Sequence, residues 1–323
     1  MPYAYQSEGV VSEEGANPFL EHLPPDTPVH SYDRQCVIER ILPPYSVKDR
    51  FVVIKDFPPE KFDKDEEDLP RYCDYSRPVQ ILIIKMPSQA HEEAAASFEK
   101  MITMIANDMQ VIRRIAFCGA TRVSTPDRDK QADRSWKPRR QARKFPTVAL
   151  EVGFTETTAK LEQDIAWWIN ESRGEVGMGI TVDIKGSGCI DIKSWIPAFD
   201  PSLQRDYVTA SGRHVNNTDN LPPPQVAQTV LFKRGGDDSG PTIEGEGLTI
   251  PFHTLFLDEP GEGERDFVLT SDMLLLHLAE CVWDAIDDVE EIKARREASC
   301  CSGRFQVGFA TKALHVQSTD AIS

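Results

Sequence analysis

Apolar runs and helical patterns alternate through the middle of the chain. Residues 79–86 are almost wholly apolar, which is typical of a fully buried β-strand. Residues 88–110 repeat apolar positions at helical spacing behind a serine, which predicts a capped amphipathic helix. Strand patterns return at 113–123, around the sequence ADRSW, and at 147–154. The pattern therefore predicts one buried strand, a helix and then three strands.

A second amphipathic helix is predicted at 157–171, where Leu161, Ile165 and Trp168 share one face and Thr155 or Thr157 precedes the first turn. Two further strand patterns follow it, joined by a Gly-Ser-Gly turn. The central order is thus helix, three strands, helix and strand, with an added hairpin. We expect an α/β or α+β fold from this alternation.

The two ends of the chain differ from this central part. The first thirty residues are polar and rich in Pro and Gly, so we expect poor order there. Residues 56–78 are acidic and Pro-rich and are typical of a long connection. Strand patterns at 227–234 and 242–256 precede a helix pattern at 270–297. The expected organisation is a segment 1–30, a core 31–200, C-terminal strands and a helix 201–300 packed on the core, and a tail 301–323.

Composition is that of an ordinary globular protein, with 40% hydrophobic and 27% charged residues in 323. No secretory signal precedes the fold, and no apolar run approaches the roughly 18 residues that a membrane span requires. We therefore expect an intracellular protein, cytoplasmic or nuclear, without a membrane partner. Seven scattered cysteines without CxxC spacing favour reduced thiols over disulfides or a zinc site.

The net charge of −16 argues against a surface that binds nucleic acid broadly, because phosphate affinity is mostly electrostatic. Residues 128–144 reverse this balance locally, with eight basic and two acidic side chains. A run of charge of this kind is usually a solvated loop. This one leads directly into strand 147–154, so its side chains are also candidates to hold a phosphate backbone: Arg134, Lys137, Arg139 and Arg140.

Glu151 is a lone carboxylate in the apolar run of that strand. A buried carboxylate must find a cation, a metal or hydrogen-bond donors, so Glu151 is either part of an ion pair or a working group. Asp133 lies on the preceding strand pattern, and two carboxylates at one end of a sheet form a typical Mg²⁺ site. Such an ion could generate a hydroxide and shield the charge that develops on a phosphodiester.

Lys160 is the candidate for the basic group beside the attacking water. At 100° per residue it lies with Asp164 along one border of the apolar face of helix 157–171. From that border it could reach the strand end that carries Glu151. The alternative is an ordinary surface ion pair between Lys160 and Asp164 at i, i+4.

Together, the element order, the Asp of ADRSW, the strand PTVALEVG and the helix LEQDIAWW resemble the restriction-endonuclease-like PD-(D/E)XK superfamily. The likeness covers residues 79–196 and is strongest to a poorly characterised group of fungal proteins. It implies a nuclease-like core with a central mixed sheet flanked by helices, carrying N- and C-terminal extensions. In that superfamily the matching acids bind a catalytic metal ion and a lysine assists the attacking water.

Carried onto this chain, the resemblance assigns the metal ligands to Asp133 and Glu151 and the lysine to Lys160, with Glu99 on the first helix as a further candidate ligand. The pattern departs from the superfamily in two places. Gly153 stands where the lysine of the strand is expected, and Ala132 rather than a proline precedes Asp133.

Two functions follow from these residues. The first is a metal-dependent nuclease that uses Mg²⁺ or Mn²⁺ and binds nucleic acid through the basic segment. The second is a catalytically inactive nuclease-like fold that serves as a binding or scaffold module with a protein partner, in which Arg134, Lys137 or Lys160 neutralises Glu151. Gly153 and the acidic remainder favour the second function, whereas the paired carboxylates and the basic segment favour the first.

Overall fold

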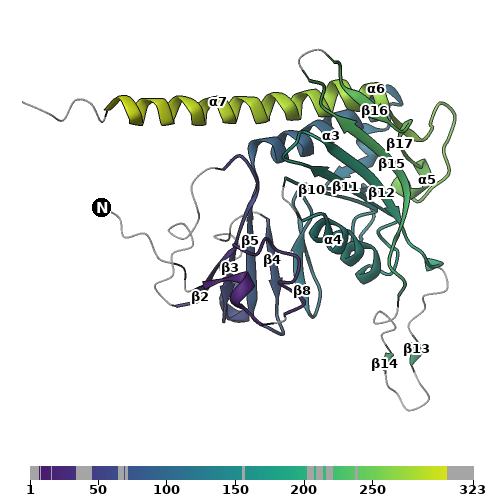
Figure 1. Cartoon of the computed structure of the whole chain (residues 1–323). Coiled ribbons are helices and arrows are strands. Elements are labelled where there is room, and N and C mark those ends of the chain that lie inside the picture. The colour runs from purple at the N-terminus through teal and green to yellow at the C-terminus, as the bar shows by residue number, and fades with distance from the viewer. Residues whose placement is uncertain are drawn as a thin grey trace, which may run out of the picture.

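The structure is a computed structural model, shown in Figure 1. It describes residues 7, 9–15, 17–33, 46–64, 69, 72–154, 157–201, 207–208, 214–215, 221–236 and 239–303. Two mixed β-sheets, each of seven described strands, and several helices make up these residues, so the expected mixed α and β fold class is confirmed.

The core sheet, as we call the first of these, contains the predicted helix–strand–strand–strand–helix–strand order. It runs β16-β15-β12-β11-β10-β9-β6, and β10 is antiparallel to β9 but parallel to β11. Its strands are β6 (Ile115–Phe117), β9 (Arg134–Pro138), β10 (Val148–Gly153), β11 (Met178–Ile184), β12 (Ile190–Ile196), β15 (Gln225–Lys233) and β16 (Thr242–Glu244). Helix α3 (Gln89–Asp108) precedes them and α4 (Thr158–Glu171) connects β10 to β11. The element order expected for the core is therefore present.

Helices α3 and α4 cover opposite faces of the core sheet. Successive side chains of β10 point to alternate faces, so each helix packs on its own set. Val148, Leu150 and Val152 belong to the apolar cluster that includes α3, whereas Ala149 packs in the cluster of α4. Small residues let α4 lie close to the sheet. A Cβ on Gly179 would lie 2.6 Å from a carbon of Ile165.

Helix α3 begins where the sequence predicts, because the Ser88 hydroxyl accepts a hydrogen bond from the backbone N–H of His91. A C-terminal helical stretch packs across it, formed by α6 (Ser271–Leu274), a π-helical turn (Leu275–Ala279) and α7 (Glu280–Gly303). This stretch begins at a capped turn, since the Thr270 side chain accepts a hydrogen bond from the backbone N–H of Met273. Figure 1 shows that α7 then continues well beyond the body of the protein.

The cover sheet, as we call the second sheet, was not predicted. It runs β1-β2-β3-β5-β4-β8-β7. Its strands are β1 (Gly9–Val10), β2 (Pro28–Ser31), β3 (Arg50–Lys55), β4 (Cys73–Ser76), β5 (Ile81–Met86), β7 (Arg122–Ser124) and β8 (Arg128–Gln131). The buried strand expected at 79–86 is β5.

Two expectations about the N-terminal part are corrected by this sheet. The described part of 1–30 forms β1, a 3₁₀ turn (Val11–Glu13) and most of β2, and buries Leu20 and Leu23 against the sheet. The connection expected at 56–78 contains α2 (Pro59–Lys64) and β4.

The chain crosses between the two sheets twice near the candidate site. Residues 113–123 are not one strand, because β6 lies in the core sheet and β7 in the cover sheet, with Gly119 at φ +54° in the turn between them. The second crossing runs from β8 to β9 through Ala132 and Asp133. Asp133 therefore lies at a junction of both sheets.

The remaining described elements lie at the C-terminal side: the pairs β13 (Tyr207–Val208) with β14 (His214–Val215) and β17 (Gly247–Ile250) with β18 (Phe267–Thr270), and the short helix α5 (Phe252–Phe256). Residues 304–323, most of the expected tail, lie outside the described residues. No helix in the described ranges has both the length and the apolar character needed to cross a bilayer.

Candidate functional site

Asp133 is buried, and its carboxylate accepts from several donors. The ammonium of Lys85 on β5 lies 3.1 Å from Oδ1 and 2.9 Å from Oδ2. The backbone N–H of Val152 donates to Oδ2 at 2.6 Å, and Nε2 of His91 lies 3.2 Å from Oδ1. Burial raises the pKa of Asp133, but Lys85 and His91 outweigh it and hold that pKa well below its usual range.

Glu151 points from β10 toward α4 and is also buried, with only 2% of the residue exposed. The indole N–H of Trp168 donates to Oε1 at 2.7 Å, and the ammonium of Lys130 on β8 lies 3.4 Å from the same oxygen. Burial raises the pKa of Glu151 to about 7, even though the charge of Lys130 opposes the shift. The carboxylate thus has a partner but loses much of its hydration.

Lys160 reaches the same interior from α4. Its ammonium bonds both oxygens of Asp164 at 2.6 and 2.5 Å, so the i, i+4 pair considered as an alternative is present. The pair is buried rather than on the surface. Burial lowers the pKa of Lys160, and the nearby ammonium of Lys130 lowers it further.

The cover sheet adds a further acid and two further bases to this cluster. Asp74 on β4 bonds the guanidinium of Arg128 on β8, which also donates to Asp164 at 3.2 Å. Lys130 on the same strand lies 3.1 Å from Asp164. Positive and negative side chains therefore alternate through the interior, and each carboxylate faces at least one cation.

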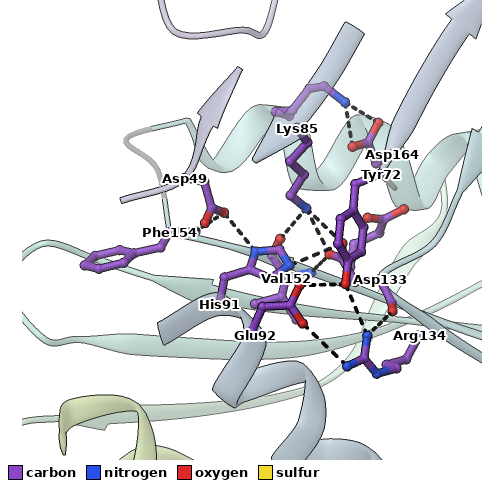
Figure 2. A network of polar contacts seen from close by, with 12 residues as sticks. Asp49, Tyr72, Lys85, His91, Glu92, Asp133, Arg134, Val152, Phe154 and Asp164 are labelled. Carbon is purple, nitrogen blue, oxygen red and sulfur yellow. Dashed lines mark hydrogen bonds and ion pairs between the residues drawn. The ribbon is translucent and has the colours of Figure 1, made fainter. Parts of the chain in front are cut away.

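His91 and Asp49 extend the network toward the start of α3, as Figure 2 shows. Nδ1 of His91 lies 2.8 Å from Asp49 Oδ2, and neither side chain is exposed. Burial lowers the pKa of His91, but Asp49 and Asp133 outweigh it and raise that pKa to about 9. The imidazole is accordingly a cation between two carboxylates.

Asp133, Glu151 and Lys160 line one cavity of about 30 Å³ together with Lys85, Lys130 and Asp164. The sequence prediction that the three candidate catalytic residues share one location agrees with this geometry. The cavity has room for about one or two water molecules. The two sheets meet around it, so β4, β5 and β8 of the cover sheet lie where the carboxylates would otherwise face solvent.

The residues present do not fit a divalent metal ion in this arrangement. Among the described residues no group of three or more His, Cys, Asp or Glu side chains is placed to hold one. Glu99, the further candidate ligand, does not line the cavity, and its carboxylate instead lies 3.3 Å from Nε of Arg134. The two candidate metal ligands that do line the cavity, Asp133 and Glu151, already face Lys85, His91 and Lys130.

The candidate phosphate-binding side chains lie apart from the cavity. Arg134 donates to the backbone oxygen of Asp133 and contacts Tyr72, Glu92 and Glu99 at an open hollow of about 730 Å³. Lys137 donates to the carbonyl of Arg143. Arg139 and Arg140 are exposed beside Arg113 and Arg114 at another hollow.

None of the three residues expected to neutralise Glu151 does so. Arg134 and Lys137 are engaged elsewhere, as described above, and Lys160 bonds Asp164. Lys130 supplies the positive charge beside Glu151 instead, and Trp168 donates a hydrogen bond to it. Both lie within segments that the sequence singled out, the basic run and helix 157–171, yet neither was assigned this role.

Comparisons with known proteins add little to this geometry. No family model matches the chain, and no curated protein matches it. Among solved structures, a candidate nuclease belonging to DUF820 from Anabaena variabilis aligns with a TM-score of 0.32 and 14% sequence identity, covering 47% of this chain and 92% of that chain. The likeness of the core to nucleases therefore stays a prediction from the sequence and the element order.

Proposed function

We propose that the chain is a nuclease-like fold that serves as a binding or scaffold module and does not itself hydrolyse phosphodiesters. The observation that carries this proposal is that both candidate metal ligands are committed to the protein's own donors. Asp133 is bonded by Lys85, His91 and the N–H of Val152, and Glu151 by Trp168 with Lys130 nearby.

A metal ion would have to displace these cations from a buried site. Breaking a buried ion pair on one side costs about 3–5 kcal/mol, because the remaining charge is left without a partner. Here the displaced group would be an ammonium that is mostly buried, Lys85, with 14% of its side chain exposed. The interior is thus more stable with its own cations than with an added one.

Access for a polynucleotide is also poor. The cavity beside Asp133 and Glu151 is of water size, and strands of the cover sheet line it. The chain carries a net charge of −16, which repels phosphate at long range. A partner that binds this face would contact the open hollow lined by Tyr72, Glu99 and Arg134 rather than the two carboxylates.

A metal-dependent nuclease is the second candidate function. It is favoured by one observation, that Asp133, Glu151 and Lys160 come from separate elements and line one cavity. In that role Asp133 and Glu151 would hold Mg²⁺ or Mn²⁺, Lys160 would assist the attacking water, and the basic segment would bind nucleic acid. The nuclease is less well supported than the binding module, because cations of the protein already face both carboxylates.

The two functions are separated by a cleavage assay with single- and double-stranded DNA and RNA in Mg²⁺ or Mn²⁺. Wild-type protein is compared with Glu151→Gln, which keeps the shape and the acceptor for Trp168 but removes the charge. We expect no cleavage above background from either protein. Metal-dependent cleavage by the wild type that is lost in Glu151→Gln would contradict the proposal and establish the nuclease. Equal cleavage by both proteins would also contradict the proposal and would remove Glu151 from the mechanism.

A further inference from the structure

Lys85 belongs to the cover sheet, yet its ammonium lies among oxygens of the core sheet. Nζ is 2.9 and 3.1 Å from the two carboxylate oxygens of Asp133 and 2.8 Å from the backbone carbonyl oxygen of Val152. Figure 2 shows Lys85 pointing into this group from the opposite sheet. Three oxygen atoms from two segments therefore surround one nitrogen.

Glu151 acts on this ammonium at longer range, because the two side chains do not form an ion pair with each other. Its side chain lines the same cavity as Lys85 and Asp133. Its charge acts on the lysine strongly enough to contribute to a pKa shift: burial lowers the pKa of Lys85, but Asp133, Glu151 and Asp49 outweigh it and hold that pKa above its ordinary value. The lysine is therefore a fixed cation.

Carboxylate and backbone carbonyl oxygens are the ligands that hard divalent cations take in proteins. Here they converge on an ammonium group. We propose that Lys85 is the built-in cation of this site, and that its ammonium stands in the place where a divalent ion would lie between Asp133, Glu151 and the carbonyl of Val152. This inference rests on the proposed non-hydrolytic function, because it explains what replaces the metal.

The donors would stay in place without Lys85. Asp133 remains anchored by the N–H of Val152 and by His91, and Glu151 remains bonded to Trp168. Removing the lysine side chain adds its volume to the existing cavity of about 30 Å³. The site then has surplus negative charge, oxygen ligands and room for waters, which together suit Mg²⁺ or Mn²⁺.

The test is gain of metal binding on loss of the ammonium. Wild type, Lys85→Ala, Lys85→Arg and Lys85→Ala/Glu151→Gln are titrated with Mn²⁺ alone, and free Mn²⁺ is measured by electron paramagnetic resonance alongside thermal unfolding. We expect Lys85→Ala to bind Mn²⁺ and to gain about 3 °C or more in Tm at saturation. Wild type and Lys85→Arg should not respond, and the double variant should bind at least about tenfold more weakly.

Several outcomes overturn the inference. The inference is wrong if a folded Lys85→Ala protein binds no Mn²⁺. It is also wrong if the wild type binds Mn²⁺ as tightly as Lys85→Ala does. If Lys85→Ala is unfolded alone, folding on addition of Mn²⁺ supports the inference. Lys85→Met, which keeps the side-chain volume, is the second variant. If both neutral variants stay unfolded in millimolar Mn²⁺, the ion cannot take over from the ammonium and the inference is wrong.

This proposal and the proposed function fail in different ways. Cleavage by the wild type that depends on Glu151 contradicts the proposed function. An inert wild type together with a Lys85→Ala protein that ignores Mn²⁺ contradicts the inference about Lys85 alone. Binding and unfolding are measured without substrate, so the result for Lys85 does not depend on any activity.

Discussion

His91 and Asp49 form a fully buried pair, with 2.8 Å between Nδ1 and Oδ2 and no exposure of either side chain. The same carboxylate accepts the backbone N–H of Ser88 at 2.8 Å and that of Phe154 at 2.9 Å. One aspartate thus connects the start of α3 to the end of β10. Through its other nitrogen His91 reaches Asp133, so the pair also supports the candidate site.

Replacing His91 should therefore destabilise the protein strongly. We expect His91→Leu to lower the free energy of unfolding by about 3–5 kcal/mol, because Asp49 and Asp133 lose a buried cation. Urea denaturation measures this change. His253→Leu is the matched control: His253 is exposed, and a surface substitution of this kind should change stability by less than about 0.5 kcal/mol. Equal effects of both substitutions would show that the buried pair is not important for stability.

Stability should fall as pH rises from about 5 to about 9. The pKa of His91 is raised to about 9 and that of Glu151 to about 7, so the folded state holds protons that the unfolded state releases at lower pH. The contribution of Glu151 is complete below its ordinary pKa and is lost as pH passes about 7. The contribution of His91 is complete below its ordinary pKa and is lost as pH passes about 9.

Thermal unfolding at a series of pH values measures how stability falls with pH. Two variants separate the contribution of Glu151 from that of His91. Glu151→Gln should flatten the acidic part of the curve, because the amide does not titrate. His91→Leu should flatten the alkaline part. The lowered pKa values of Asp49 and Asp133 act only at lower pH, where their protonation destabilises the fold. A Tm that rises between pH 5 and 9 would contradict the assignment of both raised pKa values.

Gly153 has little room for the lysine that the superfamily pattern has at this position. A Cβ at this position would lie 3.1–3.2 Å from three carbons of Leu161. We expect Gly153→Lys to destabilise the protein by about 1–3 kcal/mol. The new ammonium would also enter a cavity that Lys85, Lys130 and Lys160 already line. No metal-dependent cleavage should be gained.

A double-mutant cycle checks the steric cause of this effect. Leu161→Ala makes room beside the new Cβ, so Gly153→Ala should cost less in the Leu161→Ala background than in the wild type. Unfolding free energies of the four proteins give the coupling energy. Additive effects would show that contact with Leu161 is not the reason for the glycine.

The core sheet was predictable because its elements carry strong periodic patterns. Residues 88–110 and 157–171 have clear helical stripes, and 147–154 is a long apolar run, so α3, α4 and β10 lie close to their expected bounds. Apart from β5, the cover sheet was missed, because five of its seven described strands are only two to four residues long and leave little pattern in the sequence. Its pairing also joins segments far apart in the chain, such as β4 with β8, which local patterns do not encode.

The candidate site was half predicted for the same reason. Asp133, Glu151 and Lys160 come from the core sheet and α4, where neighbouring positions could be inferred from the element order. Their cations Lys85 and Lys130 come from the cover sheet. One signal was available: Lys85 is a lone charge beside the apolar run of β5, just as Glu151 is in β10. An isolated charge in a buried strand indicates that a partner of opposite charge lies elsewhere in the interior.

Opposite charges on the two sheets also bear on how the protein unfolds. Asp133 and Glu151 approach the shared interior from one side, while Lys85 and Lys130 approach it from the other. If either side lost its water alone, Asp133 and Lys85 would each be buried without the other. Separation of the two sides would admit water to both at once, so we expect the two sheets to lose their contact together rather than one after the other.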